Sequence, residues 1–295
     1  MSASAEVADQ KPSEVILAAT PLRIGVVKLR VRNLERISDY YRQTLGLKIL
    51  ECDSGLVRLG VGSAPLLELR GDPALRPRNP RGAGLFHTAF LMPTRGDLAS
   101  WLRNAKANRL LLIGASDHAV SEAIYLTDPE GNGIEICADR ATSAWRSVEG
   151  AIRMPSDPLD VDDLLRADPD RKWTEAPHEL VVGHMHLQVG ALPAAEVFYG
   201  NILGFDITCR YPGGSFFGAG GYHHQIATNI WNSRNAGPID EGSAGLAGFE
   251  ILVKDFGRLN SIRQRSARGG VRIDEADAGL TLRDPWGLPI ALNTT

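Results

Sequence analysis

The strongest constraint on the fold is an internal repeat. Segment 25–49, GVVKLRVRNLERISDYYRQTLGLKI, aligns without a gap with segment 183–207, GHMHLQVGALPAAEVFYGNILGFDI, at an offset of 183 − 25 = 158. A repeat of this kind means that one supersecondary unit is built more than once. The matched positions are Leu29 with Leu187, Val31 with Val189, Leu34 with Leu192, Tyr41 with Tyr199, Leu45 with Leu203, and Gly46 with Gly204.

Each copy alternates apolar and polar residues, then changes to a helical period that ends at a glycine. Two weaker relatives begin at Gly84 and Gly245, with helices near 97–107 and 256–267. Both relatives place a turn, DPEG at 128–131 or DPWG at 284–287, before a last strand. The chain is therefore predicted to be an α+β protein of four βαβββ modules.

These modules divide the chain into segments. Residues 21–140 hold modules one and two, and residues 181–295 hold modules three and four. A segment rich in Pro and Asp, 141–180, is predicted to be a linker. Residues 1–20 are predicted to be a disordered leader; the alternative is a short arm that pairs with another subunit.

Composition excludes several classes of partner. The 32 basic and 35 acidic residues give a net charge of −3, which provides no electrostatic reason to expect nucleic acid or an anionic membrane. No apolar run reaches the ~20 residues of a membrane span, and the polar start does not resemble a signal peptide. Three well-separated cysteines, Cys52, Cys137 and Cys209, fit a reducing cytoplasm. A homo-oligomer is the default expectation for a soluble enzyme.

The stretch 116–135, SDHAVSEAIYLTDPEGNGIE, combines several chemically distinct features. It contains His118, a hydrophobic–Tyr pair at Tyr125, the DPEG turn, and Glu135 ten residues after the tyrosine. This stretch resembles the signature of extradiol dioxygenases in the vicinal oxygen chelate superfamily, which also includes glyoxalase I and the bleomycin-resistance proteins. Ser116 departs from the pattern, in which a residue such as Gly, Asn, Thr or Val is usual. Within that superfamily the chain resembles the two-domain bacterial catechol 2,3-dioxygenase branch.

The resemblance implies that modules pair into two half-open barrels and that a metal is bound from first and last strands. The first-strand positions of the four modules are Val26, His87, His184 and Gly248, and the last-strand positions are Glu68, Glu135, His224 and Ala291. Modules one and four lack a ligand set. Modules two and three are therefore expected to form the metal barrel, although in many extradiol enzymes the metal lies within modules three and four.

His87, His184 and Glu135 form the two-imidazole, one-carboxylate set typical of Fe(II) oxygenases, and Mn(II) could also bind it. Glu135 lies in the apolar run IEIC, where an unpaired buried carboxylate would be costly and a metal would supply counter-charge. His186 lies two residues from His184 and faces the same side of the strand, so it stays open as the alternative ligand.

The resemblance also implies roles for three further residues. Tyr125 would hydrogen-bond a catecholate oxygen, and His118 would bind the substrate and screen its charge. His224, in the stretch HQIA, resembles the histidine that transfers protons, which suits a group with a pKa near 6.5. His223 is expected to point to the opposite face of the strand and is the less favoured candidate.

The predicted function is extradiol cleavage of a catechol by O₂ to a muconic semialdehyde-type product. One alternative is a glyoxalase-like lyase or isomerase using Zn, Ni or Mn, whose base would be a metal-bound glutamate. Another is a non-enzymatic small-molecule binder of the bleomycin-resistance type. The sequence does not decide which catechol is the substrate.

Overall fold

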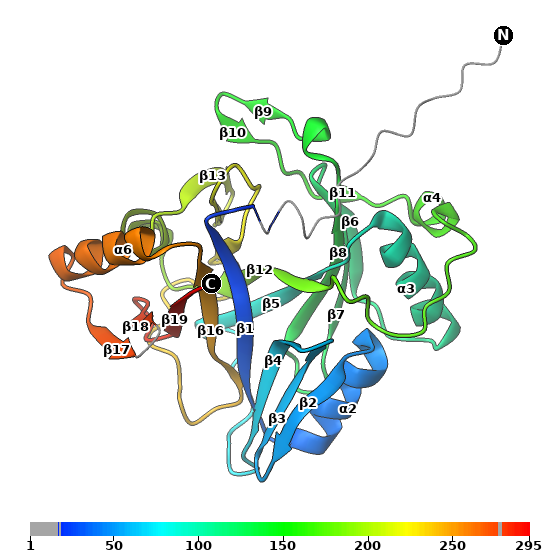
Figure 1. The fold of residues 1–295 in the computed structure, drawn as a ribbon, viewed down its shortest axis with the longest axis horizontal. Helices are drawn as coiled ribbons and strands as arrows, with labels where there is room; N and C mark the ends of the chain where they lie inside the picture. The colour runs from blue at the N-terminus through cyan, green and yellow to red at the C-terminus, as the bar shows by residue number, and fades with distance from the viewer. Residues whose placement is uncertain (1–16, 18, 277–278) are drawn as a thin grey trace.

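The computed structural model describes residues 17, 19–276 and 279–295 and contains the four predicted modules (Figure 1). Module one comprises β1 (Leu22–Val31), α2 (Leu34–Leu45), β2 (Lys48–Asp53), β3 (Leu56–Val61) and β4 (Ala64–Gly71). Module two comprises β5 (Gly84–Leu91), α3 (Arg95–Ala107), β6 (Gly114–Asp117), β7 (Ser121–Thr127) and β8 (Gly133–Asp139).

Module three comprises β12 (Val181–Gln188), α5 (Leu192–Ala195), the π-helix η2 (Glu196–Ile202), β13 (Asp206–Tyr211), β14 (Gly214–Gly218) and β15 (Ile226–Asn229). Module four comprises β16 (Gly245–Val253), α6 (Phe256–Arg268), β17 (Ile273–Ala276), β18 (Gly279–Arg283) and β19 (Pro289–Thr294). The repeat predicted from the sequence is thus confirmed, and the helices lie outside the strands in Figure 1.

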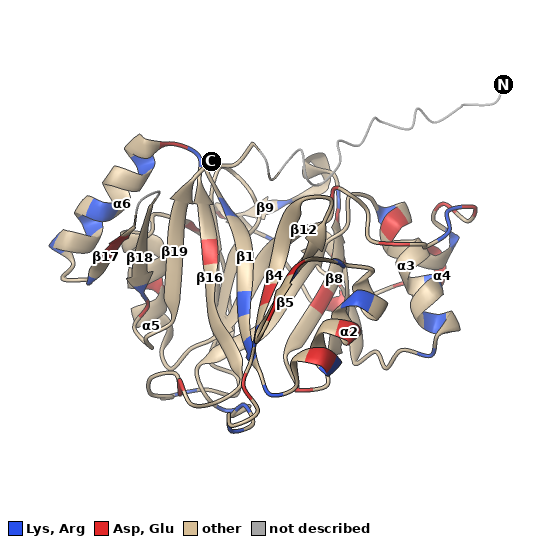
Figure 2. Cartoon of the chain, turned by 60° about the horizontal axis from the view of Figure 1, so that its bottom comes forward, with Lys and Arg blue, Asp and Glu red and all other residues tan. Residues whose placement is uncertain are grey.

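The modules pair in the order that the ligand positions predicted. Modules two and three share one sheet, β11-β6-β7-β8-β5-β12-β15-β14-β13, because β5 pairs antiparallel with β12. Modules one and four share the other, β17-β18-β19-β16-β1-β4-β3-β2, through antiparallel β1 and β16. Each curled sheet forms a half-open barrel, and the two sheets are visible side by side in Figure 2.

The segment predicted as a linker has regular structure of its own. It contains the 3₁₀ turn η1 (Thr142–Ala144), the hairpin β9 (Ser147–Val148) and β10 (Ala151–Ile152), β11 (Asp157–Pro158), and α4 (Val161–Arg166). β11 pairs with β6 and so forms the edge strand of the sheet that holds modules two and three. Through β11, the segment 141–180 thus extends the sheet that holds modules two and three.

The predicted leader is only partly within the described residues. Residues 1–16 and 18 lie outside them. Leu17 is buried, and the Thr20 hydroxyl donates to the Leu17 and Leu22 carbonyls. The packed chain therefore begins before Pro21, earlier than the sequence pattern predicted.

Local chemistry explains where the helices begin and end. The Asn33 side chain accepts from the Arg36 amide at the start of α2, and Gly46 ends the helix at φ 70°. Such a left-handed conformation favours glycine. Gly204, the counterpart in the repeat, has φ 84°.

Lys and Arg lie among Asp and Glu along most of the helices and loops drawn in Figure 2. The exception is α6, whose only charged residues are arginines. Among the described residues, no helix combines the length and the apolarity needed to cross a membrane.

The two DP turns are built alike, and the second makes a pH-dependent contribution to stability. Asp284 Oδ1 accepts from the Trp286 and Leu288 amides at 2.9 Å, and Oδ2 accepts from the Tyr199 hydroxyl at 3.0 Å. Burial raises the pKa of Asp284 to about 6. Because the folded state holds this proton more tightly than the unfolded state, stability falls as pH rises from about 4 to about 6.

Asp284→Asn removes the proton linkage but keeps an acceptor oxygen for both amides. The unfolding free energy of the variant relative to the natural protein should therefore rise by about 1 kcal/mol between pH 5 and pH 7.5. Urea denaturation of both proteins at the two pH values measures this difference. An equal difference at both pH values would refute the linkage.

Candidate metal centre

Four neighbouring strands place one row of side chains across the inner face of the sheet that holds modules two and three. Tyr125 on β7 lies opposite Glu135 on β8, Glu135 lies opposite Ala89 on β5, and Ala89 lies opposite His184 on β12. His87 precedes Ala89 by two residues, so it shares the same face. The alanine has no side chain beyond Cβ, which leaves room at the centre of the row.

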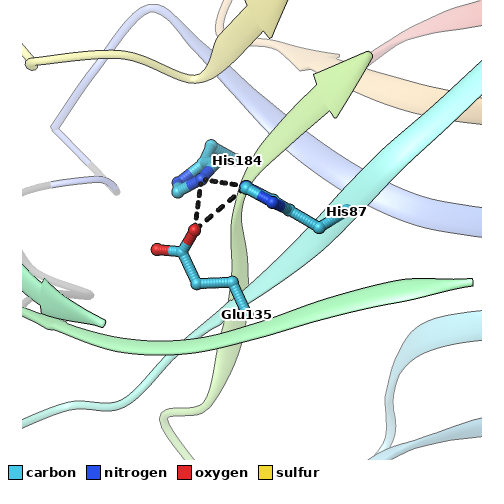
Figure 3. A group of neighbouring side chains, drawn as sticks. All are labelled: His87, Glu135 and His184. Carbon is cyan, nitrogen blue, oxygen red and sulfur yellow. Dashed lines mark hydrogen bonds and ion pairs between the residues drawn. The ribbon is translucent and has the colours of Figure 1, made fainter. Parts of the chain in front are cut away.

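His87, His184 and Glu135 converge on one point (Figure 3). The Nε2 atoms of the two histidines lie 3.3 Å apart, and Glu135 Oε2 lies 2.9 Å from His87 Nε2 and 3.5 Å from His184 Nε2. All three side chains are buried. They are the one group of potential metal ligands found among the described residues.

The protonation of this cluster suits a cation. Burial lowers the pKa of His87 and so favours a neutral ring with a lone pair. Burial by itself would raise the pKa of Glu135, but the imidazoles of His184 and His87 outweigh it and hold that pKa well below its usual range. The result is one carboxylate facing two imidazole nitrogens.

The buried donor atoms are also short of partners. Glu135 Oε1 has no hydrogen-bond partner among the described residues, although such an atom is costly to bury alone. The Nε2 atoms of the two histidines also face one another at 3.3 Å beside the same Glu135 oxygen, so a neutral ring that presents its lone pair there has no donor. A divalent ion would satisfy all these atoms, so the residues present fit a His₂Glu metal site.

The other sheet offers no comparable arrangement among its described residues. Its one carboxylate at an equivalent position, Glu68, already receives Arg70 at 2.9 Å and Arg58 at 3.1 Å. Val26, Gly248 and Ala291 carry no ligand atoms in their side chains. The difference in residue type between the two sheets explains why the candidate ligands gather in one of them.

The candidate ligands open into a cavity of about 500 Å³, a size typical of small-molecule sites. All six residues singled out from the sequence line it: the three ligands together with His118, Tyr125 and His224. Phe86, Phe216 and Trp231 add aromatic walls. Met154 and Ser156 reach the cavity from the segment that was predicted to be a linker.

His118 and Tyr125 form a hydrogen-bonded pair. The Pro155 carbonyl lies 2.6 Å from His118 Nδ1, so that nitrogen carries a proton. His118 Nε2 then accepts from the Tyr125 hydroxyl at 2.6 Å. Burial, with the Glu135 carboxylate nearby, holds the pKa of Tyr125 well above its usual value, so the phenol stays protonated.

His186 lines the cavity but is not part of the ligand cluster. Its Nε2 lies 3.0 Å from Asn229 Nδ2, which makes the amide the donor and the imidazole the acceptor. Burial, reinforced by His87 and His184, holds the pKa of His186 well below its usual value. The geometry therefore favours His184 over His186 as the ligand.

His224 faces the candidate ligands from the connection before β15, where its ring centroid lies 4.2 Å from that of His184. Burial is the main cause that holds its pKa well below the usual value, and His184 and His223 add to the effect. The ring is therefore neutral.

His223 does not line the cavity, as expected of the less favoured candidate, but strand alternation is not the reason. β15 begins only at Ile226, so strand alternation does not apply, and His223 is fully buried beside His224 with the two Nδ1 atoms 2.8 Å apart. No pattern in the sequence indicated this contact, because a tight turn rather than a strand orients both rings.

Comparisons with known proteins agree with the architecture. The family model of the Glyoxalase/Bleomycin resistance protein/Dioxygenase superfamily matches residues 23–136 and 181–292. Catechol-2,3-dioxygenase of Bacillus subtilis (strain 168) is 38% identical over 267 residues, which are 89% of this chain and 93% of that protein. The chain belongs to this superfamily and, by its resemblance along nearly the whole length, to the extradiol dioxygenases within it.

Other relatives match less of the chain or the fold alone. Biphenyl-2,3-diol 1,2-dioxygenase 2 of Rhodococcus globerulus is 31% identical over 42% of this chain and 65% of that protein. A solved putative dioxygenase from Bacillus subtilis has a TM-score of 0.63 at 15% identity, covering 93% of this chain and 85% of that one. Glyoxalase I from Zea mays has a TM-score of 0.56 at 18% identity, covering 92% of both chains.

Proposed function

We propose that the protein cleaves a catechol with O₂ at one Fe(II) held by His87, His184 and Glu135, giving a muconic semialdehyde-type product. The buried His₂Glu cluster at the base of an aromatic-walled cavity carries this proposal. The similarity to a catechol-2,3-dioxygenase over 89% of the chain supports the same reaction class. Mn(II) fits the same ligands, so Fe(II) is the expectation for oxygen chemistry rather than the only fit.

Iron in this set would supply Lewis acidity and electronic coupling between a chelated catecholate and O₂. The protein's own contribution begins with His224. Its neutral imidazole lines the cavity beside His184 and can take a proton from a catechol hydroxyl as substrate enters. The imidazolium formed in this way is a stronger acid than an exposed one, so it can return the proton at a later step.

Tyr125 and His118 would orient the substrate. The Tyr125 phenol stays protonated and lies beside Glu135 in the row of side chains, within the cavity wall. The Tyr125 hydroxyl can donate to a catechol oxygen in place of His118 Nε2. It can also accept a hydrogen bond from a catechol hydroxyl. His118 keeps its orientation throughout, because its Nδ1 is held by the Pro155 carbonyl.

The aromatic walls would bind the ring and exclude water. Phe86 packs on His87 with centroids 5.3 Å apart and on Trp231 at 5.4 Å. Phe216 packs on His224 at 5.1 Å. A planar aromatic substrate that displaces water from such a surface gains hydrophobic and edge-to-face contacts.

The experiment that tests this proposal is anaerobic loading with Fe(II), followed by catechol and then air. A yellow ring-fission product should appear with the iron-loaded protein, and the matched Zn(II)-loaded protein should produce none. If the Mn(II)-loaded protein also turned over catechol, the proposed reaction would stand and only the identity of the metal would change. Absence of product with both Fe(II) and Mn(II), for plain and substituted catechols, would refute the proposal.

A glyoxalase-like reaction is the second candidate because maize glyoxalase I has the same fold. Its base would be a second metal-bound glutamate. Among the described residues that line the cavity, Glu135 is the one carboxylate, and the fourth position holds His224. Activity that requires Zn(II) or Ni(II) and is absent with Fe(II) would favour this alternative.

The expected cytoplasmic location and homo-oligomeric state stay predictions for this protein. Size-exclusion chromatography with light scattering measures the oligomeric state directly. The three cysteines, Cys52, Cys137 and Cys209, are free in the structure.

A further inference from the structure

A chain of buried hydrogen bonds lies behind His224. His223 Nδ1 is 2.8 Å from His224 Nδ1, and His223 Nε2 is 3.0 Å from Asp139 Oδ1. The second carboxylate oxygen of Asp139 accepts from the Tyr222 hydroxyl at 2.8 Å. The side chains of His223 and Asp139 are 1% and 2% exposed, so water does not compete for these bonds.

The partners in this chain determine where each hydrogen sits. The Asp139 carboxylate can only accept, so His223 Nε2 carries a hydrogen. With a single ring proton on His223, its Nδ1 is bare and accepts from His224 Nδ1–H. His224 Nε2 is left with its lone pair, and it is the nitrogen available to the cavity that His224 lines.

Packing prevents the rings from leaving this arrangement. The His223 ring lies against Tyr222 with centroids 4.1 Å apart and against Trp145 at 4.9 Å. Trp145 is itself anchored, because its indole N–H donates to the Arg140 carbonyl at 3.0 Å. A group locked by packing and by hydrogen bonds holds its geometry before any ligand arrives.

We propose that His223 and Asp139 are positioning residues that fix the orientation and the tautomer of His224, so that its Nε2 faces the substrate as a proton acceptor. The proposal rests on the proposed function, since it assigns a support to the proton-transfer residue of the same site. A carboxylate that orients a neighbouring imidazole serves the same purpose in hydrolytic triads. Here a second histidine lies between the two groups.

The first test reads the tautomers directly in the metal-free protein. Long-range ¹H–¹⁵N spectra of histidine-labelled protein distinguish Nδ1–H from Nε2–H rings, and His223→Phe and His224→Phe assign the signals. The natural protein should show Nε2–H at His223 and Nδ1–H at His224. Asp139→Leu, which leaves His223 Nε2–H without its acceptor, should remove the constraint, so that both ring tautomers of His224 appear.

This spectroscopic test does not depend on turnover. Nε2–H at His224 in the natural protein would overturn the proposal, as would a single, unchanged His224 tautomer in Asp139→Leu. If the natural protein failed to cleave any catechol, the proposed function would fall while these spectra still decided the hydrogen-bond chain.

The second test uses a double-mutant cycle on the iron-loaded enzyme. His223→Phe keeps the aromatic packing and removes both hydrogen bonds, so kcat should fall about 10- to 100-fold, the usual effect of an outer-shell partner. KM and iron content should stay unchanged. In a His224→Phe background the same change should cause no further loss, because His223 acts through His224.

His223→Gln is the matched conservative variant. A glutamine amide can donate through its nitrogen to Asp139 and accept through its oxygen from His224 Nδ1–H, which preserves the polarity of the chain. It should therefore retain most of the activity that His223→Phe loses. Equal losses in His223→Phe and His223→Gln, or equal losses from His223→Phe in both backgrounds, would show a merely structural role and overturn the proposal.

Discussion

Replacing any one of His87, His184 or Glu135 by alanine should weaken metal binding at least about 100-fold, more than the loss of an outer-shell group does. The reason is that each variant leaves only two donor atoms of a three-atom cluster. Purified protein should carry close to one iron or manganese per chain, and each variant little. Elemental analysis after dialysis against a weak chelator measures the difference.

His186→Gln is the matched control for these variants. His186 lies two residues from His184, is equally buried and lines the same cavity, but its Nε2 accepts from Asn229. It should keep its metal. If metal content survives all three alanine changes, or is lost only in His186→Gln, the ligand assignment is wrong.

Replacing His224 by phenylalanine should reduce turnover by about 10²- to 10⁴-fold, the usual contribution of a positioned acid–base group. The ring is retained, so its packing against Phe216 and His184 persists, while the nitrogen that exchanges protons is gone. Metal content and anaerobic catechol affinity should remain near normal, because three ligands and the open positions are unchanged. Iron analysis, catechol titration and kcat on one preparation measure all three quantities.

Two results would contradict this prediction. Loss of iron from His224→Phe would make the residue a fourth ligand and would favour the glyoxalase-like alternative. Full activity with normal iron would show that the proton passes through another group, with His186 and His118 the next candidates in the cavity.

Much of the candidate site could be predicted from the sequence because its residues recur at equivalent places in repeated modules. Glu135 lies ten residues after Tyr125 on the next strand, and antiparallel pairing brings them opposite one another. His87 and His184 occupy matching positions of β5 and β12, and this pairing places His184 opposite Ala89, one step diagonal to His87. Period-two alternation then carries all these side chains to one face.

The parts that could not be predicted are contacts without a local pattern. Asp139 and His223 are 84 residues apart, and they meet only because the end of β8 passes the turn before β15. The Pro155 carbonyl that holds His118 belongs to a segment that was predicted to be a linker. A backbone carbonyl carries no residue-specific signal in the sequence, and the direction of a ring in a tight turn depends on its neighbours.

Local patterns along the chain predicted the four modules and the types of side chain at their equivalent positions. Strand and helix periods and glycine turns depend on neighbouring residues, so they can be predicted from the sequence. The ligand positions also predicted that modules two and three share a barrel, but only the folded chain shows the register in which β5 pairs with β12 and the distances that bring three donor atoms within reach of one ion. Strand pairing and the meeting of side chains depend on hydrogen bonds and packing between distant segments, which no local pattern encodes.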